Sequence, residues 1–141
     1  QALRIASENL AANGLPTNGI VEADAFAEMR RLRDAGTTYD LVILDPPKLV
    51  HNKQQVDRGS RAYKDLNWLG LRLLNPGGVL VTFSCSGSVS PELHQKIVAD
   101  AAVDAARDVQ VIGRLHQASD HPVLLSVPET QYLKGLICRV S

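Results

Sequence analysis

Apolar residues fall into two alternating kinds of segment along the chain, one with helical spacing and one of short continuous runs. Helical spacing predicts helices over Gln1–Asn13, Asp24–Gly36, about Arg61–Leu74 and Ser90–Ala105. The apolar runs predict strands at Gly19–Ala23, Tyr39–Leu44, Val79–Ser84, Asp108–His116 and Gln131–Val140. This alternation is typical of an α/β fold, a parallel sheet with helices on both faces.

The ends of the middle strands are where chemistry is expected. In open α/β sheets, ligands bind at the carboxyl ends of the strands. Asp45 follows one predicted strand and Cys85 follows the next. Because adjacent strands lie about 4.8 Å apart, these two side chains can face one pocket. The last two predicted strands have no helix between them, so at least one of them should run antiparallel.

Composition limits the class of protein. A chain of 141 residues is long enough for one domain and too short for two. With 45% hydrophobic and 21% charged residues it is not a disordered chain. No apolar run approaches the roughly 18 residues of a membrane span, and the first helix is too polar for a secretory signal. Two cysteines without a metal-binding spacing fit a reducing, cytoplasmic compartment, and no metal site is expected.

Asp45-Pro46-Pro47-Lys48 is the sharpest local motif. Proline cannot donate a ladder hydrogen bond, so the pair ends the strand and directs the preceding carboxylate and carbonyl outward. Two acceptors in that arrangement suit the planar amine edge of a nucleobase. The alternative is an ordinary turn begun by Asp-Pro.

Cys85 lies among small residues after a predicted strand, which leaves its thiol uncrowded. A thiolate is a strong nucleophile, whereas most free cysteines behave as small buried hydrophobes. Position alone leaves both roles open for Cys85. Cys138 lies inside the last predicted strand and is assigned to packing.

Positive charge is concentrated in the segment between Lys48 and Asp65, which holds five basic and two acidic residues. Such a segment attracts phosphate, and the alternative is a solvated loop.

Five motifs in order carry a resemblance to a known family: Asp45–Lys48, Arg61–Asn67, Thr82–Gly87, Asp120–Val123 and Tyr132–Gly135. Together they resemble the catalytic domain of the bacterial 23S ribosomal RNA cytosine-5 methyltransferases, whose full chains carry an N-terminal PUA domain. The first motif alone is only moderately specific, but the five in sequence are highly specific. The resemblance implies a Rossmann-like class I fold, S-adenosylmethionine as cofactor and ribosomal RNA as partner.

The resemblance also implies roles for individual residues. Cys85 would be the nucleophile that adds to carbon 6 of cytosine, and Asp45 would hold the base edge around ring nitrogen 3. The cofactor would contact Asp24, Ala25, Asp45 and Pro46. Asp24 also suits a helix cap, and both roles can hold together. RNA would contact Pro47, Lys48, Lys53, Arg58, Arg61, Lys64 and, as a weaker candidate, His121.

The chain departs from this family at the cofactor site. Enzymes of this class bind the methionine end with a Gly-rich loop after the first strand, and the chain has no such loop. It resembles the C-terminal part of the catalytic domain, residues 1–141 forming one partial domain without the PUA domain or the first two strands. We therefore expect impaired cofactor binding and an inactive isolated chain. Either Gly19–Ala23 pairs directly with Leu41–Leu44, or, as we favour, a second chain closes the edge as a homodimer.

Two other functions remain as alternatives. The chain as it stands can be a non-catalytic α/β module that binds RNA or self-associates. It can also belong to a methyltransferase with a similar Asp-Pro-Pro motif that acts on another base, although that chemistry needs no thiol.

Overall fold

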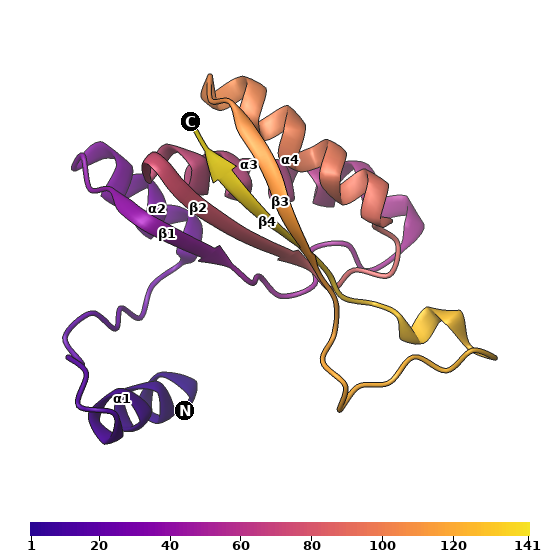
Figure 1. Cartoon of the computed structure of the whole chain (residues 1–141), viewed down its shortest axis with the longest axis horizontal. Helices are drawn as coiled ribbons and strands as arrows, with labels where there is room; N and C mark the ends of the chain where they lie inside the picture. The colour runs from indigo at the N-terminus through magenta and orange to yellow at the C-terminus, as the bar shows by residue number, and fades with distance from the viewer.

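The computed structural model describes residues 1–141 and contains a four-stranded mixed sheet (Figure 1). The elements are α1 (Ala2–Ala12), α2 (Ala25–Asp34), β1 (Tyr39–Leu44), α3 (Val56–Arg72), β2 (Leu74–Ser84), α4 (Pro91–Ala105), β3 (Val109–Leu115) and β4 (Lys134–Val140). Short 3₁₀ turns occupy Lys53–Gln55 and Pro128–Thr130. No helix is long and apolar enough to cross a membrane.

The sheet has the strand order β1-β2-β4-β3. β1 runs parallel to β2, and β4 runs antiparallel to both of its neighbours. The predicted α/β class and the antiparallel last strand are confirmed. The parallel pairing of β1 with β2 brings Asp45 and Cys85 to the same edge of the sheet.

Helices cover only one face of this sheet, so the prediction of helices on both faces is wrong. The main core joins α3 and α4 to β2 and β4 through buried residues such as Leu66, Val98, Leu80 and Leu136, with α2 packed at its margin. The first helix, α1, has no buried residue and lies apart from the sheet (Figure 1). The opposite face of the sheet therefore stays open.

No strand forms at Gly19–Ala23, so the strand predicted there is wrong, and the less favoured of the two expected outcomes, its direct pairing with Leu41–Leu44, does not occur. A strand needs a neighbour to satisfy its backbone N–H and C=O groups. Only β2 lies beside β1, whose other edge is unpaired. Only Leu44 is buried in β1, so this strand is not buried on both faces as its apolar run indicated.

Two predicted helix caps are present. The Asp24 carboxylate accepts the N–H of Ala27 at 2.9 Å, and the Ser90 hydroxyl accepts the N–H of Leu93 at 3.1 Å. By contrast, α3 begins at Val56 rather than near Arg61. Its first turns pack beneath the loop that follows β1, a contact that hydrophobic spacing does not reveal.

Candidate active site at the carboxyl ends of β1 and β2

Asp45 and Cys85 follow neighbouring parallel strands, and Leu44 at the end of β1 lies opposite Thr82, two residues before β2 ends at Ser84. Asp45 is exposed and Cys85 is half-buried. The backbone N–H of Val50, in the loop after Asp45, donates to the Ser86 hydroxyl at 3.2 Å. The segment after β1 is thus tied directly to the residue beside Cys85.

A buried polar network fixes these two loops against α3. The hydroxyl groups of Tyr63 and Ser86 are 2.9 Å apart, and the N–H of Leu49 donates to the Tyr63 hydroxyl at 3.5 Å. Tyr63 and Ser86 are completely buried. Such a buried and satisfied network holds its members in one arrangement. The sequence did not assign a role to Tyr63 or Ser86, although both lie in motifs that carry the resemblance.

Lys134 approaches the same loop from the start of β4. Its ammonium group donates to the backbone carbonyl of Ser86 at 2.7 Å. Burial lowers the pKa of Lys134, while the nearby Cys85 acts in the opposite direction. The sequence did not single out Lys134, because its position beside Ser84 follows from strand register and not from local sequence.

A cavity of about 480 Å³ lies between α2 and the end of β1. It is lined by Asp24, Ala25, Asp45, Pro46 and Pro47, with Phe26 and Met29 among its apolar residues. The structure therefore brings together every residue for which the resemblance implied a cofactor contact. Asp24 caps α2 with one carboxylate oxygen and lines the cavity at the same time.

The predicted RNA-contacting residues fall into two groups. Lys48, Lys53, Arg58 and Arg61 are exposed and form no ion pair. Lys64 instead pairs with Asp104 at 2.7 Å, and this hydrogen bond raises the Lys64 pKa. His121 is exposed in the loop between β3 and β4, and its ring Nδ1 lies 3.0 Å from the carboxylate of its neighbour Asp120. It does not line the cavity that holds Asp45.

Cys138 is completely buried in β4, as its assignment to packing predicts. Burial raises the pKa of its thiol to about 11. The two cysteines therefore differ in access, since Cys85 is half-buried at the end of β2.

Comparison with known proteins reveals relatives over nearly the whole chain, although no family model matches. It is 52% identical over 141 residues to ribosomal RNA large subunit methyltransferase I of Shewanella denitrificans, and 51% identical over 142 residues to the protein of that name in Klebsiella pneumoniae. The predicted relationship to large-subunit ribosomal RNA methyltransferases is confirmed. Each match covers 99% of the chain but only 36% of the relative, so the chain spans about a third of their length.

Solved structures show the same fold. A Streptococcus mutans protein described as a SAM-dependent methyltransferase matches 92% of the chain and 33% of its own, with a TM-score of 0.75 and 22% identity. NSun6 from Pyrococcus horikoshii matches 98% of the chain and 38% of its own, with a TM-score of 0.60 and 19% identity. The sheet is therefore part of a class I methyltransferase fold.

Proposed function

We propose that the chain supplies the nucleophile and the base-binding edge of an S-adenosylmethionine-dependent methyltransferase that forms 5-methylcytosine in 23S ribosomal RNA. The observation that carries this proposal is the hydrogen-bonded junction of the Asp45 and Cys85 loops beside the cavity that Asp24 and Asp45 line. The relatives are ribosomal RNA large subunit methyltransferases by name, which supports a ribosomal RNA substrate. Such RNA would be met in the cytoplasm.

The chemistry follows from the weakness of carbon 5 of cytosine as a nucleophile. The Cys85 thiolate forms a bond to carbon 6, and the electron pair of the ring double bond becomes available at carbon 5. Asp45 holds the base edge near ring nitrogen 3 and, acting as a carboxylic acid, donates its proton to that nitrogen as negative charge develops there. After carbon 5 has taken the methyl group, a water molecule accepts the carbon-5 proton, the electron pair of that C–H bond re-forms the ring double bond, and the bond between sulfur and carbon 6 breaks. The thiolate is restored.

The cofactor would supply the electrophilic methyl group, and the cavity suits only part of it. Phe26 and Met29 offer an apolar surface for adenine, and the Asp24 oxygen that does not cap α2 can accept from its amine. The chain has no Gly-rich loop for the methionine end. We therefore expect the 141-residue chain alone to bind S-adenosylmethionine weakly.

RNA would approach over the exposed basic residues Lys48, Lys53, Arg58 and Arg61. The target base has to leave its stack to reach Asp45 and Cys85, because both side chains lie at the end of the sheet. Pro46 and Pro47 stiffen the loop that this base meets. Lys64 and His121 are weaker contacts in this scheme, because each already has an acidic partner.

A chimaeric enzyme tests the proposal. The chain replaces the matching segment of the Shewanella denitrificans relative, and bisulfite sequencing measures 5-methylcytosine in ribosomal RNA. We expect methylation with the chimaera and none with its Cys85→Ala variant, while the matched Cys138→Ala variant stays active. RNA containing 5-fluorocytosine should form a covalent adduct only when Cys85 is present. Transfer of a radiolabelled methyl group to ribosomal RNA that survives Cys85→Ala, without 5-methylcytosine in the bisulfite reads, would instead favour a methyltransferase acting on another base.

The partial cofactor site favours a second candidate function, a non-catalytic module that binds RNA. Calorimetry with S-adenosylmethionine and RNA-binding measurements on the chain separate the two. RNA binding by the chain together with an inactive but folded chimaera would support the module. Methylation by the chimaera would exclude it.

A further inference from the structure

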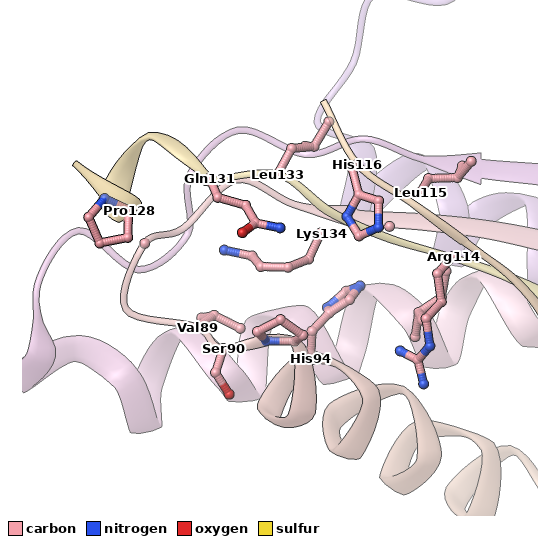
Figure 2. A pocket seen from close by; sticks show the side chains of 14 residues that line it. Val89, Ser90, His94, Arg114, Leu115, His116, Pro128, Gln131, Leu133 and Lys134 are labelled. Atoms are coloured by element: carbon pink, nitrogen blue, oxygen red, sulfur yellow. The ribbon is translucent and has the colours of Figure 1, made fainter. Parts of the chain in front are cut away.

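A second cavity, of about 320 Å³, lies around Lys134 between the start of α4 and the strands β3 and β4 (Figure 2). Its walls are the start of α4, the end of β3, the start of β4 and the residues just before β4. Arg114, His116 and Lys134 supply its basic side chains, and no carboxylate lines it. Arg114 and His116 lie outside the site described above, and Lys134 links that site to this cavity through the Ser86 carbonyl.

The Arg114 and Lys134 side chains of this cavity have no directly paired carboxylate, although Glu92 in the first turn of α4 is near enough for Arg114 to help lower its carboxyl pKa. Neither Arg114 nor Lys134 forms an ion pair. Arg114 donates to the Gln95 side-chain carbonyl at 2.5 Å, and Lys134 donates to the Ser86 carbonyl at 2.7 Å. Both acceptors are neutral, so positive charge remains at the cavity wall. Burial lowers the Lys134 pKa, as expected for an ammonium group that has lost water without gaining a carboxylate.

His94 forms part of the cavity wall from α4 (Figure 2). Its ring is almost completely buried, with Nε2 at 3.4 Å from the carbonyl of Thr82, and burial lowers its pKa. The ring is therefore neutral near pH 7 and adds shape to the cavity. The charge that a ligand would meet comes from Arg114 and Lys134, with His116 exposed beside them.

We propose that this cavity binds the RNA backbone next to the target cytidine, with Arg114 and Lys134, whose charged groups lie on opposite sides of His94 (Figure 2), each contacting a different phosphate. The inference rests on the proposed function. Its position follows from Lys134, which contacts the residue directly after Cys85. A nucleotide whose base reaches Cys85 therefore has its flanking phosphate within reach of this charge. Guanidinium and ammonium groups form short, strong hydrogen bonds with phosphate oxygens.

Fluorescence anisotropy with a labelled single-stranded RNA of about 12 nucleotides tests the site. The double variant Arg114→Gln/Lys134→Gln is compared with Arg139→Gln/Lys96→Gln, which removes the same charge from exposed positions outside the cavity. We expect the cavity variant to weaken binding about tenfold or more and to reduce the salt slope by about 1.4, that is about 0.7 for each lost contact. Equal losses in both double variants would overturn the proposal.

Two further measurements separate a local effect from misfolding and from other ligands. Lys134→Arg keeps the charge, so it should retain most of the RNA affinity that Lys134→Gln loses, at an unchanged circular dichroism spectrum. Loss of binding in both single variants would contradict a charge contact. Inorganic phosphate that binds the chain without competing with the RNA would assign the cavity to free phosphate and overturn the RNA assignment.

The same variants in the chimaera separate this proposal from the proposed function. If the cavity variant binds RNA and methylates it normally, the proposed phosphate site is contradicted and the proposed function is not. A chimaera that forms no 5-methylcytosine would contradict the proposed function. If its RNA binding were still weakened by Arg114→Gln/Lys134→Gln and not by the control variant, the phosphate site would stand.

Discussion

Cys85 and Cys138 place the same side chain in two different environments, and their reactivity should differ accordingly. At pH 8 we expect iodoacetamide to label Cys85 in the folded chain, because its thiol is half-buried at a strand end. Cys138 should stay unlabelled, since it is inaccessible and its pKa is raised to about 11. Peptide mass spectrometry measures both sites, with a urea-denatured sample as the control in which both react. Comparable labelling of Cys138 in the folded chain would contradict the assignment.

His94 makes stability depend on pH. Its pKa lies below the ordinary value of 6.5 because burial disfavours the charged ring. As pH falls below about 6.5, the unfolded chain binds a proton that the folded chain does not, so the free energy of unfolding decreases. A single such group contributes a slope of at most about 1.4 kcal/mol per pH unit. The stability that depends on a neutral His94 ring is fully present above about pH 6.5 and is lost progressively as the pH falls below that value.

Urea unfolding of the wild type at pH 7.5 and 5.5, compared with His94→Gln, measures this contribution. The variant should show a smaller decrease between the two pH values, and the exposed His51→Gln should match the wild type. An unchanged pH dependence in His94→Gln would mean that another group is responsible.

At the residue scale, local sequence predicted what depends on neighbours along the chain. Asp24 and Ser90 cap helices because each precedes an apolar helical pattern. Lys134 and Tyr63 were not predicted, because their partners lie 48 and 23 residues away along the chain, in both cases at Ser86. Only strand register and helix packing bring them together.

At the scale of elements, the contact between α3 and the loop after β1 depends on Gly59. A Cβ added there would lie 2.2 Å from a Val50 methyl group and 2.7 Å from the Leu49 carbonyl oxygen. The loop would have to move, which would weaken the bonds from Val50 to Ser86 and from Leu49 to Tyr63. The site therefore needs glycine for close approach and not for backbone flexibility.

We expect Gly59→Ala to destabilise the chain by about 1–3 kcal/mol, the usual cost of overpacking. Alanine normally stabilises a helix by about 1 kcal/mol relative to glycine, so a loss of stability has the opposite sign from helix propensity. Urea unfolding and hydrogen exchange at the Val50 amide measure the two effects. Gly19→Ala is the control, because nothing lies within 4 Å of its added Cβ. A stabilised Gly59→Ala chain would show that the loop is not packed on α3.

A predicted strand forms wherever a neighbouring strand pairs with it, at the edge of the sheet as well as at its centre. The edge strands β1 and β3 lie within one residue of their predicted bounds, whereas the central strand β2 begins at Leu74, before the predicted Val79. β2 and β4 are flanked by neighbours and covered by α3 or α4, and their apolar runs became strands. Gly19–Ala23 has the same kind of apolar run but no neighbour, and it forms no strand. An apolar run thus specifies a strand only where the rest of the sheet is present to receive it.

At the scale of the whole molecule, the free edge of β1 and the open face of the sheet expose apolar groups. Leu41 is 53% and Ile43 is 60% exposed, and the outer edge of β1 has no partner strand. An edge of this kind is a template for pairing with another chain. The free edge of β1 is therefore the reason to expect a homodimer. This prediction applies to the 141-residue chain by itself.

Sedimentation velocity tests the dimer directly. We expect the chain to sediment as a dimer and the Leu41→Lys/Ile43→Lys variant as a monomer, because lysine at an edge strand opposes pairing. Val103→Lys is the matched control, since Val103 is 78% exposed on α4 and lies away from the β1 edge. It should leave the dimer intact. A monomeric wild-type chain, or a dimer that persists in the lysine variant, would show that β1 does not form the contact.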